Sequence, residues 1–306
     1  MEAQRVIGVD LGGTKILAGV VDRDGSVERR HEWPTPLDSQ ETLLQGLARA
    51  VDGVRDEDVA AIGFGIPSTI DQRSGRAVTS VNIPLADLDL RAWMRDRFGL
   101  PVGIDNDANA ATLAEWAHGA GRGARHMIML TLGTGIGGGL ILDGRPYRGA
   151  IGAGAELGHM VIDVDGPPCQ GACPGHGHLE ALASGHAATE AAREAFGPAA
   201  DAHRLVRLAN EDDETAIEIL AHLGRNLGAG IATLVNVFNP ELVVVGGGFS
   251  AAGEFLLAPA REFVAREALL PARDLVRIVR AELGTAAGLV GAGLVAFEAL
   301  DGLPAA

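Results

Sequence analysis

Short apolar runs on either side of glycine-rich turns recur in the first half of the chain. The run 6–10 leads through such a turn into the run 16–21, and the run 128–132 leads in the same way into the run 140–142. Runs of this length that flank glycines are typical of β-hairpins. The two patterns are offset by 121 positions, which favours an internal duplication over two unrelated hairpins that match by chance.

The rest of the pattern predicts a mixed α/β protein. An apolar position every three to four residues indicates helices, expected at 39–52, 91–98, 108–119, 179–195, 215–236 and 286–300. Short apolar runs indicate buried strands, expected at 59–66, 102–105 and 241–245. The segment 197–214 is polar and alanine-rich, and its Glu-Asp-Asp-Glu run at 211–214 is expected to be a loop or the solvated start of a helix. A chain of 306 residues suits two lobes better than one core.

Composition and charge exclude several classes of protein. The formal charge of −15 lacks the basic footprint that binding to a nucleic-acid backbone requires. No uninterrupted run of about 20 apolar residues is present to span a membrane. The N-terminus has neither the basic start nor the long apolar block of a secretory signal. We therefore expect a cytoplasmic protein that binds neither nucleic acid nor membrane.

The glycine turns have the composition of phosphate-binding loops, because bare backbone N–H groups can approach phosphate oxygens closely. In the first turn, Asp10 can orient Mg²⁺ through water and Thr14 can donate a hydroxyl. A strand follows the second turn where a dinucleotide fingerprint would need a helix. Ordinary hairpin turns remain the alternative. The candidate nucleotide-binding residues are Asp10, Gly12, Gly13, Thr14, Lys15 (the only lysine), Gly133, Thr134, Gly135, Gly246 and Gly247.

A second candidate site follows the predicted strand 102–105. Asn106 and Asp107 stand where this strand gives way to a helix, and ligands bind at strand ends in α/β folds. The helix dipole favours the ionised form of Asp107. Alternatively, Asp107 only caps the helix, although Asn106 or Asp105 can fill that role instead.

Potential metal ligands gather between Glu156 and Glu180. Two cysteines and nearby histidines can supply the two thiolates and two imidazoles of a closed tetrahedral zinc site. Such a site is structural, because no coordination position stays open for water. The alternative is an unliganded histidine-rich loop. The candidate ligands are His159, Cys169, Cys173 and either His176 or His178.

The motifs DLGGTK, NDAN, LGTGIGGG, GAELGHM and the Cys/His loop ending in Leu-Glu resemble those of the ROK family (repressors, uncharacterised frames and sugar kinases), in the family's order over nearly the whole chain. The resemblance implies an actin-like ATPase fold of two ribonuclease-H-like lobes with a central cleft. It implies ATP with Mg²⁺ at the glycine turns, and Asp107 as the general base. It further implies a hexose held by Asn106, Asp107, Glu156, His159 and Glu180.

The metal loop departs from the family pattern. The resemblance implies zinc bound by a histidine and three cysteines of a Cys-x-Cys-x4-Cys motif, but here the first gap is three residues long and histidine replaces the last cysteine. The four-residue gap from Cys173 to His178 is kept. We therefore expect zinc to be bound by His159, Cys169, Cys173 and His178, since imidazole is also a good zinc ligand.

The resemblance leads us to expect a hexokinase-type phosphotransferase, with glucokinase, an enzyme of glycolysis, as first choice. Kinases of N-acetylmannosamine, fructose, mannose or allose remain alternatives, as do a polyphosphate donor and a non-catalytic sugar sensor. A repressor is not expected, because only nine residues precede Asp10. We expect a homodimer with a small lobe of residues 1–118 and 287–306 and a large, zinc-binding lobe of residues 119–286.

Overall fold

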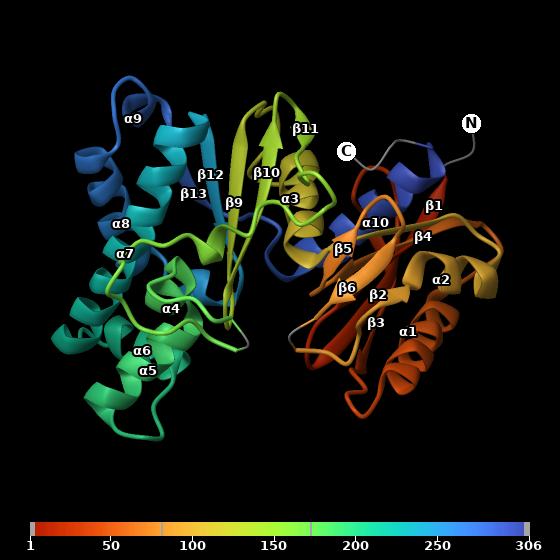
Figure 1. Cartoon of the computed structure of the whole chain (residues 1–306), viewed down its shortest axis with the longest axis horizontal. Coiled ribbons are helices and arrows are strands. Elements are labelled where there is room, and N and C mark those ends of the chain that lie inside the picture. Colours follow the sequence, from red (N-terminus) through yellow and green to blue (C-terminus); the bar gives the residue numbers. More distant parts are fainter. Residues whose placement is uncertain (1–3, 81, 172, 303–306) are drawn as a thin grey trace. The chain divides into compact units, whose positions relative to one another are not determined.

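The computed structural model describes residues 4–80, 82–171 and 173–302 (Figure 1). The chain divides into two compact units. The first comprises Met1–Gly123, Arg145–Ala155 and Leu283–Ala306, and the second comprises Ala124–Gly144 and Glu156–Glu282. Each unit contains helices and a twisted sheet, which confirms the predicted α/β class. No helix in the described part of the chain has the length and apolar character to cross a membrane.

The first unit is built on a sheet with the strand order β3-β2-β1-β4-β8. The β1–β2 and β2–β3 pairs are antiparallel, whereas β4 runs parallel to β1 and to β8. The strands are β1 (Arg5–Leu11), β2 (Lys15–Val21), β3 (Val27–Pro34), β4 (Val59–Ile66) and β8 (Val102–Asn106). A smaller sheet contains β5 (Thr69–Asp71), β6 (Arg76–Thr79) and β7 (Leu88–Asp89), and the helices are α1 (Gln40–Val54), α2 (Leu90–Phe98), α3 (Asp107–His118), η3 (Gly284–Ala286) and α10 (Ala287–Leu300).

A row of glycines explains how α10 packs on this sheet. Gly8, Gly63 and Gly103 lie side by side in register on β1, β4 and β8. A Cβ atom at any of the three would collide with the α10 backbone. The glycines therefore form a groove in the sheet that admits this helix of small and apolar residues, whose face toward the sheet is buried.

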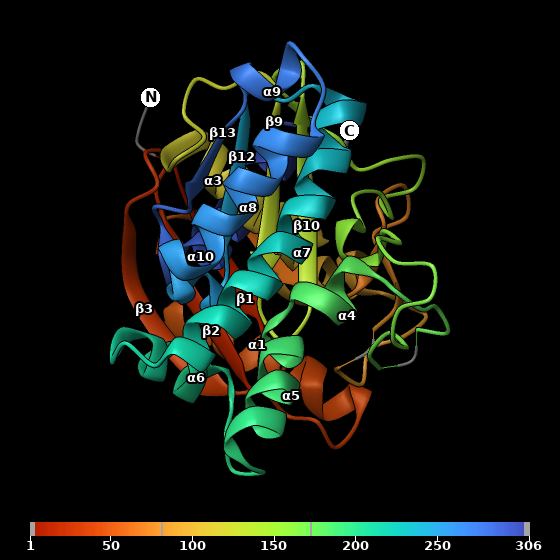
Figure 2. The ribbon, with the colours of Figure 1, turned by 90° about the vertical axis from the view of Figure 1, so that its left-hand side faces the viewer.

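The second unit repeats the strand pattern, with the order β10-β9-β12-β13. As in the first unit, an antiparallel hairpin is followed by strands that run parallel to its first member. This repetition agrees with the predicted duplication. The strands are β9 (Met127–Leu132), β10 (Ile136–Leu142), β12 (Leu242–Gly246) and β13 (Arg277–Arg280), and the helices are η1 (Leu157–His159), α4 (Leu179–Ala183), α5 (Gly185–Phe196), α6 (Ala202–Asn210), α7 (Glu214–Phe238), η2 (Gly248–Ala252), α8 (Glu254–Glu267) and α9 (Ala272–Leu275). The long helix α7 packs along α8 (Figure 2).

One predicted helix differs from the structure. The helix expected at 179–195 is divided at Ser184, whose extended backbone ends α4 and whose hydroxyl accepts a hydrogen bond from Ala187 N to begin α5. The Glu-Asp-Asp-Glu run at 211–214 lies between α6 and α7 and includes the cap of α7, Asp213, so the loop or helix start expected there is confirmed. The polar residues before this run contain α6, which Asp201 caps. Leu205 and Ala209 on the inner face of α6 are buried, and that burial outweighs the polar composition.

The compact units have other bounds than the expected lobes, which stay a prediction. The chain changes unit near Gly123 and Glu282, and Arg145–Ala155, which begins with the short strand β11 (Arg145–Pro146), groups with the first unit. The carboxylate of the fully buried Glu115 accepts hydrogen bonds from Ala120 N at 3.0 Å and Leu283 N at 2.7 Å. Glu115 thus ties both flanking segments of the chain to the first unit.

Glu115→Ala is therefore expected to lower the free energy of unfolding by about 2–4 kcal/mol, because two partly buried backbone donors lose their acceptor and the buried volume of the side chain is emptied. Denaturant titration of the variant measures this loss. Glu41→Ala, in the exposed first turn of α1, is the control and should change stability by less than about 0.5 kcal/mol. A loss below about 1 kcal/mol at position 115 would contradict the anchoring role.

Candidate active site

The β1–β2 turn has a backbone fixed by local hydrogen bonds. Gly12 N donates to Lys15 O at 2.8 Å, and the Thr35 hydroxyl donates to Gly12 O at 2.7 Å. Thr35 N donates to Thr14 O at 3.0 Å. The Lys15 ammonium lies 3.0 Å from Glu32 Oε2 on the neighbouring strand, and both side chains are about half exposed. Lys15 is thus placed beside the turn, with its charge paired in this conformation.

Asp10, at the end of β1, has an unusual electrostatic setting. Burial and the nearby carboxylate of Asp107 raise the pKa of Asp10 to about 6, although Lys15 and Arg30 oppose the shift. A side chain at Gly288, in the first turn of α10, would collide with the Asp10 carboxylate. The first unit therefore brings two predicted functional carboxylates, Asp10 and Asp107, close enough to interact. Such a pair favours a cation between or beside its members.

This setting predicts that Asp10→Asn stabilises the protein at alkaline pH. The folded-state pKa of Asp10 is raised, so the stabilising contribution of the protonated form is present below about pH 4 and is lost as the pH rises through about 6. At pH 8 the ionised carboxylate is a cost that asparagine avoids. We expect the variant to gain about 1–2 kcal/mol at pH 8, after allowance for solvent screening, and nothing at pH 4. Unfolding titrations without divalent cations test this, and a variant less stable than wild type at pH 8 would contradict it.

The junction between β8 and α3 holds the predicted base. Asn106 caps the helix, because its Oδ1 accepts hydrogen bonds from Ala108 N at 2.9 Å and from Asn109 N at 3.3 Å. Asp107 is the first residue of the helix, partly buried, and its Oδ1 accepts from Ala108 N at 2.9 Å. Of the two capping arrangements considered from sequence, Asn106 therefore fills the role of the cap.

The β9–β10 turn is held by the start of α5. Gly133 O accepts a hydrogen bond from Gly185 N at 2.9 Å, and Thr134 O accepts from His186 N at 3.2 Å. At its far end, Ile136 N donates to Glu180 Oε2 at 2.7 Å. A side chain at Gly135 would collide with this carboxylate. Glu180, predicted to bind the sugar, therefore also fixes the glycine turn predicted to bind phosphate.

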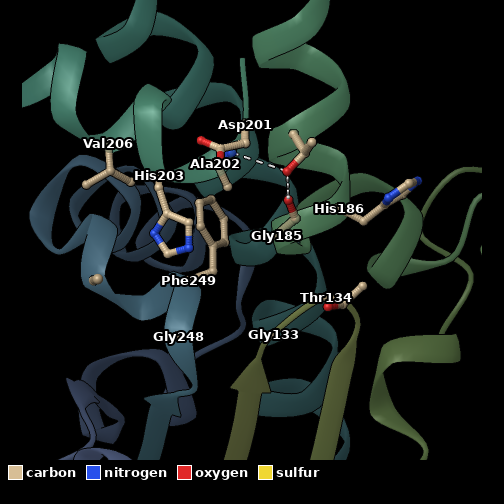
Figure 3. Close-up of a pocket in the computed structure, with 12 residues that line it drawn as sticks. Gly133, Thr134, Gly185, His186, Asp201, Ala202, His203, Val206, Gly248 and Phe249 are labelled. Carbon is tan, nitrogen blue, oxygen red and sulfur yellow. Dashed lines mark hydrogen bonds between the residues drawn. The ribbon is translucent and has the colours of Figure 1, made fainter. Parts of the chain in front are cut away.

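A cavity of about 430 Å³ lies beside this turn (Figure 3). Gly133 and Thr134 line it together with Phe249 and residues from the α5–α6 region. Ala202 N at the start of α6 donates a hydrogen bond to Thr189 Oγ1 of α5 at 3.2 Å, and this bond holds the two helices together on that side of the cavity. A largely apolar cavity that contains an aromatic ring and adjoins a glycine turn has the chemistry of a nucleotide-base site. The remaining lining residues are Gly185, His186, Asp201, His203, Val206, Gly248 and Ala251.

Most residues that line this cavity carry no local sequence signal. Gly246 and Gly247, two of the candidate nucleotide-binding residues, precede Gly248, which lines the cavity. Gly247 has φ +80°, and a Cβ there would collide with the backbone of Leu132, so its role in this structure is close packing of β12 on β9. On the side of the cavity formed by the α5–α6 region, the local sequence signal is Asp201, a helix-capping residue that precedes the helically spaced apolar residues of α6.

Four potential metal ligands converge in the second unit. His159, Cys169, Cys173 and His178 each direct one ligand atom into a cluster whose members all lie within 4.8 Å of one another. His159 Nδ1 is 3.2 Å from His178 Nδ1 and 3.7 Å from Cys169 Sγ, and Cys173 Sγ is 3.5 Å from His178 Nδ1. The edges of a tetrahedral zinc shell are about 3.3–3.8 Å long, so the four side chains fit that ion. His176 lies outside the cluster.

The metal cluster adjoins the side chains predicted to bind sugar in the same unit. Burial raises the pKa of Glu156, with Glu180 adding to the effect and His159 opposing it, so these three groups are neighbours. Cys169 Sγ lies 3.8 Å from Glu180 Oε1. His159 directs Nδ1 into the cluster, which leaves its Nε2 for a second partner. His159 can thus serve both predicted roles.

Burial and a hydrogen bond with Cys173 raise the pKa of Cys169 to about 12. The thiolate is therefore disfavoured unless a cation offsets the desolvation. A divalent zinc ion supplies that charge, and coordination deprotonates a thiol. The donor set and its spacing both fit a structural zinc site.

The chain is similar over nearly its full length to several bacterial sugar kinases. A glucokinase from Streptomyces coelicolor is 36% identical over 311 residues, covering 95% of this chain and 97% of the relative. A ROK family glucokinase from Streptomyces griseus, solved in complex with glucose and AMPPNP, matches with a TM-score of 0.85 at 35% identity, covering 96% of this chain and 99% of that chain. The ROK hexokinase from Thermus thermophilus matches with a TM-score of 0.82 at 38% identity, covering 98% and 100%.

These similarities confirm the expected actin-like ATPase fold. The model of the family described as "ROK family" matches residues 6–299, which is nearly the whole chain, and the protein therefore belongs to the ROK family.

Proposed function

We propose that the protein is an ATP-dependent glucokinase, which transfers the γ-phosphoryl group of ATP to glucose and releases glucose 6-phosphate and ADP. The observation that carries this proposal is the similarity over nearly the full length to a ROK family glucokinase solved with glucose and AMPPNP. The chain also has a carboxylate at a helix start, Asp107, beside a second carboxylate, Asp10.

The sugar would be held by hydrogen bonds and activated by Asp107. Asn106 and Asp107 offer an amide and a carboxylate in the first unit, and Glu156, His159 and Glu180 offer their polar groups in the second. Asp107 would accept the proton as the sugar hydroxyl attacks, contributing about 10²–10⁴-fold to the rate. Because the transition state of phosphoryl transfer is loose, positioning and charge neutralisation supply most of the remainder.

The nucleotide would be bound by the two glycine turns and the cavity beside the second turn. Backbone N–H groups of Gly12, Gly13, Gly133 and Gly135 would face phosphate oxygens, with the Thr14 and Thr134 hydroxyls beside them. When bound, Mg²⁺ would neutralise part of the phosphate charge. Asp10 is the residue suited to bind the water molecules around Mg²⁺. The Lys15 side chain would have to break its ion pair with Glu32 in order to reach a phosphate. Gly246 and Gly247 would shape the turn after β12 that brings Gly248 to the cavity.

Zinc would be structural, bound by His159, Cys169, Cys173 and His178. It would fix the loop that presents His159 and Glu180. The cytoplasmic location, the homodimer and a place in glycolysis remain predictions, as do the lobe boundaries at 118/119 and 286/287.

A coupled ADP-release assay with ATP and Mg²⁺ tests the sugar specificity. Glucose should be turned over far faster than mannose, fructose, N-acetylglucosamine or N-acetylmannosamine. A clear preference for another of these sugars would replace glucose as the substrate. If no sugar is turned over but one of them stabilises the protein against heat, the sugar-sensor alternative would replace the kinase.

The cavity assignment makes a separate prediction. Ala202→Leu adds three carbon atoms to a residue that lines the cavity, so we expect the KM for ATP to rise about 10-fold and the KM for glucose to change less than about twofold. Ala265→Leu, at an exposed position of α8 outside this cavity, is the matched control and should change neither constant. An unchanged KM for ATP in the Ala202 variant would mean that the adenine base of ATP binds outside this cavity.

A further inference from the structure

The segment Arg145–Ala155 is anchored in the first unit, although residues of the second unit precede and follow it in the chain. Ile151 O accepts a hydrogen bond from Gln72 N at 2.8 Å, and Ala150 O accepts from the Arg73 guanidinium at 2.9 Å. Gly152 has φ +103°, and a Cβ there would collide with Ile70 O. This close fit holds the backbone that leads directly into Glu156, one of the predicted sugar ligands.

Arg148 is the buried anchor of this segment. Its side chain is 3% exposed, yet it carries a full charge. Arg148 Nε donates to Asp105 Oδ2 at 2.6 Å, and its Nη2 donates to Glu298 Oε2 on α10 at 2.7 Å. A guanidinium is well suited to join two carboxylates, because its donors point in fixed directions.

Asp105 links Arg148 to the junction between β8 and α3, where the proposed catalytic base Asp107 lies. While Oδ2 receives Arg148, Oδ1 accepts from Asn106 N at 2.8 Å, from Gln72 Nε2 at 3.1 Å and from Asn109 Nδ2 at 3.2 Å. The Asp105 side chain is 1% exposed. The carboxylate thus fixes the backbone just before Asp107 and a side chain on the first turn of α3.

The ion pair also affects the charge around Asp107. Asp105 lies two residues before Asp107, and its buried charge would disfavour a second carboxylate nearby unless it were neutralised. Arg148 supplies the neutralising charge. Loss of a partner from a buried pair leaves an uncompensated charge, which is a much larger perturbation than loss of a surface ion pair.

We propose that Arg148 is a positioning residue that acts through Asp105 to fix the β8–α3 junction, and so couples the backbone leading to Glu156 to the base Asp107. The inference rests on the proposed kinase activity and deepens it. Glu298 accepts the second hydrogen bond of Arg148 on the α10 side, so we expect its contribution to be to stability.

The test compares Arg148→Met with Glu298→Gln, which weakens the other half of the same network and leaves the Arg148–Asp105 pair in place. In Arg148→Met we expect kcat with glucose to fall about 10–100-fold, the KM for glucose to rise and the KM for ATP to stay within about twofold. The acid limb of the pH profile of kcat/KM should move upward by about one unit, because Asp105 becomes an unpaired charge beside Asp107. The double variant Arg148→Met/Asp105→Asn should move the limb back.

Hydrogen exchange provides a readout that does not depend on catalysis. The amides of Asn106, Ala108 and Asn109 should exchange faster in Arg148→Met and should keep their rates in Glu298→Gln. If Arg148→Met does not fold, Arg148→Lys, which keeps the charge but loses the two-sided donor geometry, should show the same pattern more weakly.

Two results would overturn the positioning role. One is a lower melting temperature in the Arg148 variant with unchanged kcat, pH profile and exchange rates. The other is an equal loss of kcat in Glu298→Gln. Absence of glucose phosphorylation by the wild type would instead contradict the proposed function, and the exchange rates would still decide the positioning claim.

Discussion

Asp107→Asn is expected to lower kcat for glucose phosphorylation by about 10³-fold while the affinity for glucose changes little. Asparagine has nearly the same shape, and its amide oxygen can still accept the hydrogen bond from Ala108 N, but it cannot take a proton from the sugar hydroxyl. Steady-state kinetics gives kcat, and calorimetric titration gives the dissociation constant for glucose.

The matched control is Asp213→Asn, which also replaces an aspartate at a helix N-terminus and whose Oδ1 accepts from Ala216 N. Asparagine is an equally good cap, so this variant should keep wild-type kcat. Because Asp107 helps to raise the pKa of Asp10, the Asp107 variant should also show a lower pKa for Asp10. A kcat above one tenth of the wild-type value would refute Asp107 as the base.

Cys173→Ser is expected to remove bound zinc and to lower the melting temperature by about 10 °C. Zinc bound by the folded loop and not by the unfolded chain would contribute its binding free energy directly to stability. Serine has nearly the size of cysteine but is a poor zinc ligand. Metal analysis of the purified protein and a thermal melt test the two expectations together.

The two remaining histidines of the loop supply the control for this experiment. His178→Gln should lose zinc, because His178 Nδ1 lies in the cluster, whereas His176→Gln should keep one zinc ion per chain. Wild-type protein that is fully active and stable without zinc would contradict the structural role. Retention of zinc in His178→Gln together with its loss in His176→Gln would reverse the assignment of the fourth ligand.

The sequence was informative wherever function and local structure depend on neighbouring residues. Glycines between apolar runs predicted both hairpins, and the strand expected at 59–66 matches β4 (Val59–Ile66). The ligand spacing around Cys169 and Cys173 predicted side chains that converge in the structure, because a short loop brings close positions together.

The sequence did not predict features that depend on contacts between residues far apart in the chain. Arg148 meets Asp105 across 43 positions and Glu298 across 150, and nothing in the local pattern marks any of the three as partners. The grouping of Arg145–Ala155 with the first unit also depends on distant pairs, since the ties of this segment are made through Gln72, Arg73 and Asp105. The cavity beside Phe249 likewise combines segments separated by more than a hundred residues.

Transfer of the γ-phosphoryl group from ATP to glucose can be followed directly in a phosphorus NMR spectrum of wild-type protein incubated with ATP, Mg²⁺ and glucose. We expect loss of the γ-phosphate signal, with matched appearance of ADP and of a phosphate monoester on the C6 oxygen of glucose. ATP that stays intact, or that yields only inorganic phosphate, would contradict it.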